Sequence, residues 1–525
     1  MPRLWTLGRV LRLSCLLAVG ILQATAAIAA AVGAARLLSR PDTQDLTTAL
    51  VILFGAVAVV ALRVLQRRLA EQFALAYVKE LRLALVSHVL RMPADGSGMR
   101  FGLVMTRVVN DFSAVRLWLA SGLISILVAG CIVATIGAYL LVTQPGALAA
   151  LAPALGLWLA VLIACSGPLK RRVADSRRLR GRIAATAGTV LKGRATYLAF
   201  GRHGPLIRKL GRQTDSMNRA LTGRATLSGL LRSISDLVFP VTAIMLGFVL
   251  TGTTGTDMEA LGVLILATGI IVAQLNAVAI AVEHRFAHLI ATARLRNVFS
   301  RPTIDLSQGR SRLKRTGKGK RLEVTGLPIA DTGRHLSFVA DAGEQVALSG
   351  LRAEEIHAVF LRLAGLSDDH GGAVRLAGKA AARYSRRDWW RCICYVSQTL
   401  PPVPGVLADG VALGNAPDIS DAERGRICAR FNLTSDVLRR RLREDSHLTN
   451  GTAAAIRAAR CVLRRASVVL VDDPDVLRNA ELRSALLEEL ARQGATVVLA
   501  GEEEPDAAPP GVRVIRIDGS GRAAA

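Results

Sequence analysis

Aromatic residues are scarce in this sequence, and acidic residues are few. Phe, Trp and Tyr make up only 4% of the 525 residues, although 51% of the residues are hydrophobic and the mean hydropathy is +0.37. The hydrophobic content is therefore mainly Ala, Leu, Val and Ile, which is typical of membrane helices. This composition excludes an ordinary soluble enzyme, and the length allows two or three domains.

The shortage of acidic residues leaves a formal net charge of +27, because 67 Lys and Arg face 40 Asp and Glu. A nucleic-acid-binding protein would have such a charge, but no basic patch interleaved with aromatic residues is present. The alternative is a membrane protein with basic cytoplasmic loops. The distribution of the charges along the chain favours this alternative, with no nucleic-acid partner.

The cysteines show neither the spacing of a metal site nor that of a disulfide framework. Within Cys392-Ile393-Cys394, the two thiols would point to opposite faces of a strand. We expect all of the cysteines to be reduced residues that serve packing. They are Cys15, Cys131, Cys165, Cys392, Cys394, Cys428 and Cys461.

Six hydrophobic stretches are long enough to cross a bilayer, which takes about 20 residues of helix. The turn between the third and the fourth, Thr143-Gln144-Pro145-Gly146, has no room for a domain. The first stretch resembles a signal peptide, but no small-residue cleavage site ends it and five stretches follow, so we expect a retained helix. The stretches cover residues 11–35, 46–65, 117–142, 148–168, 227–250 and 261–282.

Lys and Arg lie almost entirely on one side of this pattern. They gather before the first stretch, after the second, and after the fourth, where Lys170-Arg171-Arg172 begins a basic segment. The turn 143–146 and the loop 251–259 contain no Lys or Arg, and only Arg36 and Arg40 fall on the opposite side. Because basic loops stay in the cytoplasm, both termini are predicted to be cytoplasmic.

Short motifs in the cytoplasmic connections carry a resemblance to a known family. Val86-Ser-His-Val-Leu-Arg-Met-Pro93, then Gly102-Leu-Val-Met-Thr-Arg107 and Val109-Asn-Asp111, resemble the first intracellular loop of ABC exporters, which holds a coupling helix. The segment 193–201 resembles the segment after that family's fourth helix, with Thr189 at a usually acidic position. Residues 294–299 resemble the exit from its sixth helix. The resemblance covers residues 1–300 and implies a multi-pass protein of the inner (plasma) membrane.

The remaining sequence has a different pattern. Residues 301–320 are polar and basic, which indicates a linker, and residues 321–525 alternate short apolar runs with helical stretches, as in an α/β domain. Tyr395-Val-Ser-Gln398, Leu448-Thr-Asn-Gly-Thr452 and Val468-Val-Leu-Val-Asp-Asp-Pro474 resemble the Q-loop, signature and Walker B motifs of ABC nucleotide-binding domains. We therefore expect a six-helix, all-α transmembrane domain followed by a P-loop-NTPase-like α/β domain.

The resemblance implies a composite site for ATP and Mg²⁺. Gln398 and Asp472 match the residues that touch Mg²⁺, and Asp473 stands where the family has its catalytic Glu. Glu502 occupies the position of the switch His. The residues expected to bind the nucleotide and its metal are Gly350, Gln398, Thr449, Gly451 and Asp472.

The phosphate loop departs most from the family pattern. A working loop reads G-x-x-x-x-G-K-[S/T], in which Lys reaches the terminal phosphates and the hydroxyl holds Mg²⁺. Gly350 is kept, but Glu355, Ile356 and His357 stand where the second Gly, the Lys and the hydroxyl belong. The interaction energy of two unit charges about 4 Å apart, such as the Lys ammonium and a phosphate, is about 4 kcal/mol at an effective dielectric constant near 20. We therefore predict that this chain does not hydrolyse ATP at its own phosphate loop, and its status as an enzyme stays open.

Two hypotheses for function follow. In this family one subunit's phosphate loop faces the other subunit's signature, so Thr449 and Gly451 would still serve a competent partner. The first hypothesis is an exporter subunit in a homodimer or, preferably, a heterodimer, which moves a lipid, a peptide or an amphipathic small molecule. The second is a non-transporting pseudo-ATPase that scaffolds or regulates another membrane complex.

Polar residues within the hydrophobic stretches are candidates for a substrate pathway, since ionisable groups inside a membrane are usually functional. Asp236, Gln274, Asn276 and Glu283 are such residues. For two of them an alternative stays open, because Glu283 is near the membrane edge and Asp236 could cap or pair locally.

Overall fold

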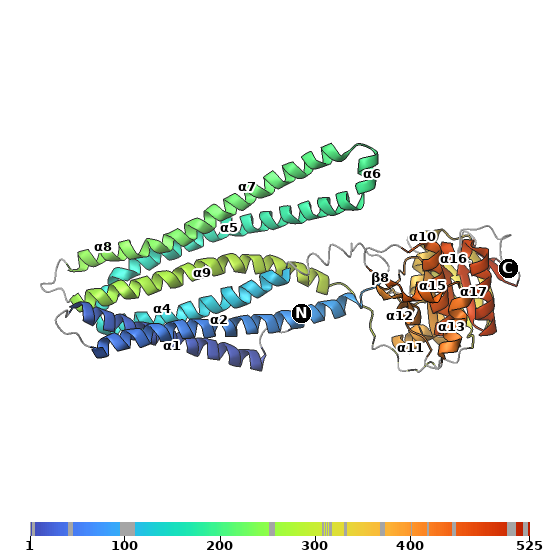
Figure 1. Cartoon of the computed structure of the whole chain (residues 1–525), viewed down its shortest axis with the longest axis horizontal. Helices are drawn as coiled ribbons and strands as arrows, with labels where there is room; N and C mark the ends of the chain where they lie inside the picture. Colours follow the sequence, from blue (N-terminus) through green and yellow to red (C-terminus); the bar gives the residue numbers. More distant parts are fainter. Residues whose placement is uncertain are drawn as a thin grey trace. The chain divides into compact units, whose positions relative to one another are not determined.

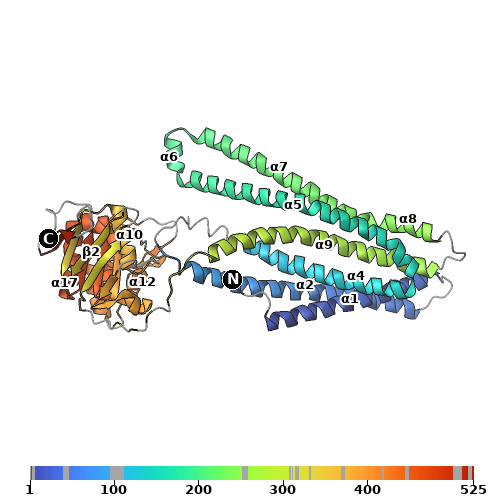
Figure 2. The same cartoon turned by 180° about the vertical axis from the view of Figure 1, so that it is seen from behind.

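A computed structural model gives the fold of the chain (Figures 1 and 2). The chain divides into two compact units, Met1–His88 with Met99–Arg301, and Val89–Gly98 with Pro302–Ala525. The structure describes residues 2, 6–39, 46–94, 111–250, 258–306, 309, 311, 313, 318–329, 333–367, 373–400, 402–416, 419–443, 448–500, 511–517 and 523–524.

The first unit is helical. Six of its described helices are long and apolar enough to cross a membrane, which confirms the six predicted stretches. The helices are α1 (Leu7–Ser39), α2 (Leu46–Val89), the π-helix η1 (Trp118–Leu123), α4 (Ile124–Thr143), α5 (Pro145–Lys192), α6 (Arg194–Ala199), α7 (His203–Asp236), α8 (Val238–Leu250) and α9 (Met258–Phe299).

Most of these helices extend far beyond the predicted hydrophobic stretches. Helix α5 has 48 residues and α2 has 44. At 1.5 Å per residue, α5 is about 72 Å long, more than twice the ~30 Å hydrocarbon core. Hydropathy identifies only the part inside the hydrocarbon, because the remainder of each helix is basic and polar. The predicted spans were therefore correct in number, and each range marks the apolar part of a helix and not its full length.

The fifth span is divided between α7 and α8, which are separated by Leu237. Pro240 lies in the first turn of α8, where its missing N–H leaves the carbonyl of Asp236 without its helical donor. The interruption therefore follows from the proline. In α5, by contrast, Pro153 and Pro168 lie inside one continuous helix.

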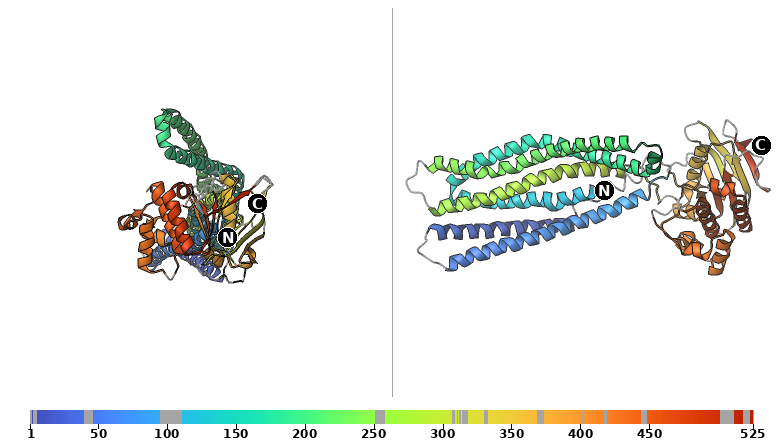
Figure 3. Two further views of the ribbon diagram at one scale, coloured as in Figure 1. Left: turned by 90° about the vertical axis from the view of Figure 1, so that its right-hand side faces the viewer. Right: turned by 45° about the horizontal axis from the view of Figure 1, so that its top comes forward.

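Helices of the first unit pack in two groups. Helix α1 packs against α4 and α9, and α5 packs along α7 and α8. Helix α6 lies at the end of the long hairpin formed by α5 and α7 (Figure 3, right). Glycines allow close approach within the first group, since a Cβ on Gly262 would lie 3.1 Å from the Cβ of Ala35. Small residues at helix contacts are typical of membrane bundles.

The second unit is α/β, as predicted. Its strands are β1 (Leu322–Pro328), β2 (His335–Ala340), β3 (Gln345–Ser349), β4 (Ala373–Leu376), β5 (Lys379–Ala380), β6 (Ile393–Ser397), β7 (Gly405–Val406), β8 (Arg441–Leu442), β9 (Val468–Asp472), β10 (Thr496–Ala500), β11 (Arg513–Ile517) and β12 (Ala523–Ala524). Its helices are α10 (Ala353–Leu363), the 3-10 helix η2 (Ala381–Arg383), α11 (Arg386–Cys392), α12 (Leu407–Ala412), α13 (Asp421–Arg430), α14 (Ser435–Arg439), α15 (Asn450–Arg464), α16 (Pro474–Arg478) and α17 (Ala480–Arg492).

A six-stranded sheet in the order β12-β11-β3-β10-β9-β6 forms the centre of this unit. Strands β11, β3, β10, β9 and β6 are parallel to one another, and β12 pairs with β11 in the antiparallel direction. Apart from Asp472 at the end of β9 and Thr496 at the start of β10, these two strands are apolar, as expected for strands covered on both faces. A second, antiparallel sheet has the order β2-β1-β4-β5. The predicted Walker B run 468–472 is the whole of β9.

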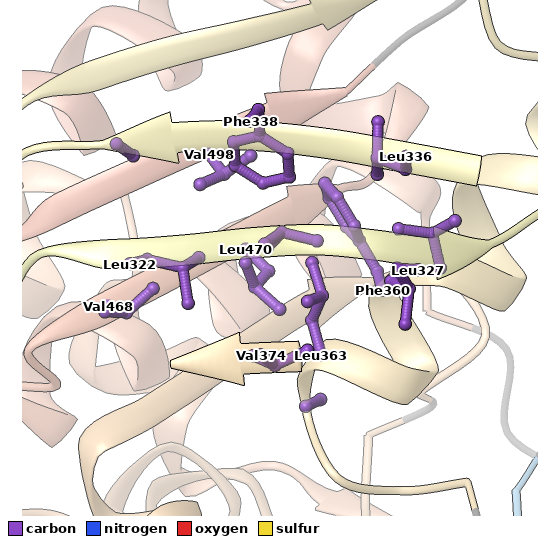
Figure 4. Close-up of a cluster of buried hydrophobic side chains, with 14 of the residues drawn as sticks. Leu322, Leu327, Leu336, Phe338, Phe360, Leu363, Val374, Val468, Leu470 and Val498 are labelled. Atoms are coloured by element: carbon purple, nitrogen blue, oxygen red, sulfur yellow. The ribbon is translucent and has the colours of Figure 1, made fainter. Parts of the chain in front are cut away.

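Two hydrophobic clusters cover the faces of the central sheet. In Figure 4, Leu322, Leu327 and Phe338 of the antiparallel sheet lie with Phe360 and Leu363 of α10 and with Leu470 of β9. The second cluster joins β9 and β10 to α15 and α17. Cys392 and Cys394 belong to different clusters, although Cys392 ends α11 and lies outside the strand. None of the seven cysteines, all of which are among the described residues, forms a disulfide.

Candidate functional site

The sheet brings several predicted site residues to one edge. Strands β3, β6 and β9 are part of one sheet, and their carboxyl ends lead into Gly350, Gln398 and Asp473. Ligands of open α/β sheets bind at this edge. The topology therefore places the phosphate-loop, Q-loop and Walker B segments together, as the motifs predict.

Gly350 has a structural role that its motif does not reveal. Its φ is +89°, and a Cβ there would lie 2.6 Å from the carbonyl oxygen of Ile517 in β11. Only glycine fits this combination of a left-handed backbone and a close approach. The survival of this glycine is therefore explained by the fold alone.

We expect Gly350→Ala to destabilise the second unit by about 2–3 kcal/mol, through backbone strain and the clash with Ile517. Gly451→Ala is the matched control, because a Cβ at Gly451 meets nothing within 4 Å. Ala at this position of α15 should be neutral or stabilise by up to about 1 kcal/mol. Denaturant titrations of both variants would measure the difference, and equal stabilities would contradict the prediction.

The segment after Gly350 forms a capped helix. Helix α10 begins at Ala353, so it includes positions that would belong to the phosphate loop. The backbone N–H of Arg352 donates a hydrogen bond of 2.8 Å to Oε2 of Glu355, and the Arg352 guanidinium lies 3.1 Å from Oε1. Glu355 is buried, and Arg334 lies 3.8 Å from the same carboxylate. Its negative charge therefore lies at the N-terminus of a helix, where a nucleotide phosphate would otherwise bind.

The backbone hydrogen bond from Arg352 is the main cause that lowers the pKa of Glu355 from 4.5. A carboxyl group with a lowered folded-state pKa stabilises the fold above its unfolded pKa, and this contribution disappears as the pH falls through the folded value. We therefore expect the second unit to lose stability on acidification below about pH 4.5.

Glu355→Gln keeps the length and the acceptor of the side chain but removes its charge. The variant should be less stable at neutral pH and should lose less stability than the wild type between about pH 5 and pH 3. Glu354→Gln, at the exposed neighbouring position, controls for net charge. Thermal unfolding across this pH range tests the prediction, which fails if the Glu355→Gln and wild-type profiles are parallel.

The two residues after Glu355 also have partners inside the fold. Ile356 is 1% exposed and belongs to the hydrophobic cluster shown in Figure 4. His357 Nδ1 lies 2.8 Å from the hydroxyl of Tyr395, which donates a hydrogen bond of 2.9 Å to Oδ2 of Asp472. His357 Nδ1 is itself 3.6 Å from that oxygen. The Walker B carboxylate is thus hydrogen-bonded within the protein.

Burial shifts the pKa values of two members of this network. It is the main cause that raises the pKa of Asp472, while the hydroxyl of Tyr395 acts in the opposite direction. Burial and the neighbouring Asp472 carboxylate raise the pKa of Tyr395, which stays a neutral donor. The network therefore combines a donated phenol proton with a partly buried carboxylate.

Asp473, at the position of the catalytic Glu, is fully buried. Its carboxylate pairs with both Nε and Nη2 of Arg457 in α15, and Nη2 lies 3.2 Å from Oδ1. The same carboxylate caps α16 by accepting the backbone N–H of Asp475 at 3.1 Å. The acceptor positions of this carboxylate are thus taken by groups of the protein.

The other predicted nucleotide-site residues lie at different places. Gln398 is exposed, and its Nε2 is 3.4 Å from Oδ2 of Asp475. Thr449 caps α15, where its hydroxyl accepts the backbone N–H of Thr452 at 3.3 Å. Gly451, in the first turn of α15, is exposed. Glu502 lies outside the described residues.

The four pathway candidates of the membrane unit do not form one cluster. Asp236 is exposed at the end of α7. Glu283 forms ion pairs with Arg224 and with Arg232, the latter at 3.8 Å. Asn276 has a buried Oδ1 with no hydrogen-bond partner among the described residues. Gln274 lines a cavity of the first unit, of about 330 Å³.

Sequence reasoning missed three residues that complete these arrangements. Arg457 neutralises Asp473, Tyr395 links His357 to Asp472, and Arg334 faces Glu355. Arg457 lies within an amphipathic helix and Arg334 near a strand, so neither position carries a signal of its partner. Tyr395 belongs to the Q-loop motif, but its contact with β9 depends on the strand order.

A family comparison decides the identity of the first unit. The profile of the ABC transporter transmembrane region matches residues 13–275, half of the chain. The chain belongs to the ABC transporter family. Its six spans and the α/β unit that follows make it a half-transporter of the exporter type.

Comparisons with individual proteins are consistent with this identity. The half-transporter is similar to a bacterial Atm1-family ABC exporter solved with ATP bound, with a TM-score of 0.83 at 16% identity, over 98% of this chain and 94% of that one. It is also 27% identical, over 173 residues, to the ATP-dependent lipid A-core flippases of Burkholderia pseudomallei and Burkholderia mallei. That match covers 31% of this chain and only 29% of each flippase.

Proposed function

We propose that this half-transporter is a subunit of an exporter that moves a lipid or another amphipathic molecule, in a dimer with a catalytically competent ABC partner. Its own phosphate loop would not bind or hydrolyse ATP, and its signature segment would complete the partner's site. The proposal rests on a difference between the two halves of the composite site. The half formed by the phosphate-loop and Walker B segments is closed by contacts within the protein, whereas the half formed by the signature segment is exposed.

The closed half does not fit Mg²⁺-ATP. The carboxylate of Glu355 lies at the helix N-terminus in place of a phosphate, and Ile356 supplies no charge. The side chains of His357 and Tyr395 contact the Asp472 carboxylate that would face Mg²⁺, and Asp473 is paired with Arg457. Without a free carboxylate or a Lys, the site has little that stabilises charge in a phosphoryl-transfer transition state.

The exposed half keeps the features that a phosphate needs. Thr449, Asn450 and Gly451 are exposed at the N-terminus of α15, where backbone N–H groups favour anions. Glycine at position 451 makes the helix less stable than alanine would, by about 0.5–1 kcal/mol. No neighbour within 4 Å of a Cβ at this position requires the small size of glycine. The close approach of a partner subunit to this helix N-terminus would explain why the position is glycine.

The α5–α6–α7 hairpin supports a dimer. Four large apolar side chains are more than half exposed around its end, namely Leu191, Leu198, Phe200 and Ile207. Such a group of exposed apolar residues usually marks an interaction surface. We assign this surface to a second ABC subunit, and a heterodimer is favoured because two copies of this chain would contain no intact phosphate loop.

The proposed substrate class and location rest on the membrane unit. The Burkholderia relatives are named for a lipid, and the half-transporter matches part of their length. The positive-inside distribution of Lys and Arg favours cytoplasmic termini in an inner membrane. A lipid of that membrane is therefore the substrate class that these observations favour.

Affinity purification of the chain from its native membrane, followed by an ATPase assay, tests the proposal. We expect an ABC-type partner to copurify, with turnover by the pair and none by the purified chain alone. Turnover by the chain alone would contradict the closed site, whereas the absence of an ABC-type partner would favour a non-transporting scaffold.

A substitution in the signature separates assembly from catalysis. Gly451→Asp in the copurified pair should lower turnover at least tenfold, because a carboxylate would face the partner's nucleotide phosphates. Gly425→Asp is the matched control: Gly425 is also a helical glycine, in α13, and a Cβ there meets nothing within 4 Å. Equal turnover in the two variants would remove the signature from the proposed mechanism.

A further inference from the structure

A polar cavity lies among four helices of the membrane unit. It has a volume of about 330 Å³ and is lined by residues of α1, α2, the η1–α4 helix and α9. Its polar lining residues are Gln23, Arg63, Gln66, Arg67, Ser121, Ser125 and Gln274, and none of its lining residues is acidic. A cavity lined by two guanidinium groups and several hydrogen-bond donors is suited to an anion.

Two side chains of the cavity lining are held in place by a hydrogen bond to each other. Gln23 is 3% exposed, and its Nε2 donates a hydrogen bond of 2.9 Å to Oε1 of Gln66. This bond joins α1 to α2 and fixes the Gln66 amide so that its NH₂ group stays a donor. Ser121 belongs to η1, and π-helical turns of this kind are frequent at functional sites.

Arg63 and Arg67 lie one helical turn apart on α2, and the structure shows no ion pair for either within its described residues. The nearby Glu71 pairs with Arg116 at 3.1 Å. At 1.5 Å per residue, Arg63 lies about 26 Å along α2 from Leu46, still within the ~30 Å hydrocarbon core. Charges at that depth are expensive unless a partner or a ligand compensates them.

The same two arginines also line a second hollow, of about 580 Å³, along α2. Its remaining lining residues are Val64, Arg68, Glu71, Gln72 and Leu75. The arginines therefore connect a polar cavity among the helices with a hollow that has an apolar floor. An amphiphile with an anionic head group and an acyl chain has the corresponding chemistry.

We infer that the cavity binds the anionic head group of a lipid, held by Arg63, Arg67 and the Gln23–Gln66 pair, with an acyl chain along the adjoining hollow of α2. The inference deepens the proposed export of an amphipathic molecule, on which it rests, by naming a phosphate-bearing lipid. Positive-inside orientation puts this end of α2 at the cytoplasmic leaflet, so the lipid would enter from that leaflet.

Binding to the detergent-purified full chain tests the inference, with native mass spectrometry as the readout. The probes are dioleoyl phosphatidylglycerol, zwitterionic dioleoyl phosphatidylcholine, and glycerol 3-phosphate as a soluble anion. For the double variant Arg63→Gln/Arg67→Gln we expect a loss of at least tenfold in affinity for the anionic lipid, since two charge-assisted contacts disappear. Arg171→Gln, at an exposed basic position of α5 that belongs to the lining of neither hollow, should change it less than twofold.

A second variant covers the case in which the double variant fails to fold. Ala120→Leu fills part of the cavity without changing charge and should also lower anionic-lipid binding. Equal losses in the Arg63/Arg67 and Arg171 variants would mean attraction to basic loops only and would overturn the inference. Full competition by glycerol 3-phosphate would do so as well, because it would assign the cavity to a soluble anion. The assay uses neither nucleotide nor partner, so failure of the proposed export leaves its outcome unchanged.

Discussion

Replacement of Arg457 by Met is expected to destabilise the second, α/β unit by about 3–5 kcal/mol, the range for a buried charge that loses its partner. The side chain of Arg457 is 6% exposed and that of Asp473 is 0% exposed. The carboxylate would keep its cap on α16 but would have no counter-charge in a site closed to water. Urea titration of the detergent-solubilised chain, followed by limited proteolysis of this unit, measures the loss.

Two further variants show whether the loss comes from the buried charge. The exposed pair Arg430–Glu488 is the control, because both side chains are about half exposed, and Arg430→Ala should change stability by less than about 1 kcal/mol. The double variant Arg457→Met/Asp473→Asn should recover much of the stability, since Asn keeps an oxygen for the cap without a charge. A loss in Arg457→Met no larger than in Arg430→Ala would refute the assignment.

The second large effect is expected where the sequence departs most clearly from the family. Ile356→Lys restores the residue type that the phosphate-loop motif has at this position. It would, however, place an ammonium group in the hydrophobic cluster, where Ile356 is 1% exposed. A buried charge of this kind costs several kcal/mol unless the group is neutralised. We expect about 3–5 kcal/mol of destabilisation and no gain of ATP binding.

Titration with a fluorescent ATP analogue, together with denaturant unfolding, measures both consequences. Ile356→Met is the matched control, because a volume-conserving apolar exchange should cost less than about 1.5 kcal/mol. A stable Ile356→Lys variant that binds the analogue would show that α10 rearranges readily into a phosphate loop, and the closed site would then be the wrong description.

The membrane unit was the more predictable part of the fold. Long apolar runs determine the number of spans, because this number follows from the bilayer as a solvent. The direction of the spans, inferred from the one-sided basic residues, stays a prediction. Hydropathy alone marks only the apolar part of a helix, since the extension of α5 past Pro168 has the composition of any exposed polar helix. The apolar runs of β9 and β10 likewise predicted buried parallel strands.

The candidate site was predictable in its position along the chain but not in its contacts. The motifs predicted a strand that ends at Asp472, which β9 confirms, and the structure then gave Asp473 a partner 16 residues away in α15. No local pattern links those two positions. The cap by Glu355 was also hidden, because the usual capping signature begins with Ser or Thr, and this helix begins after Arg352.

The burial of Ile356 beside the capping Glu355 has a consequence for the evolutionary history of the chain. Several positions would have to change together to reopen the loop: the cap, the core residue and His357, whose ring reaches the Walker B carboxylate. Any one of these reversions alone removes a stabilising contact and returns no nucleotide contact in exchange. Under the proposed loss of the ATP site, such a set of changes acts as a ratchet in a protein family held just above its stability threshold. Single substitutions that lead away from a phosphate loop are tolerated more easily than the combined changes that would restore one.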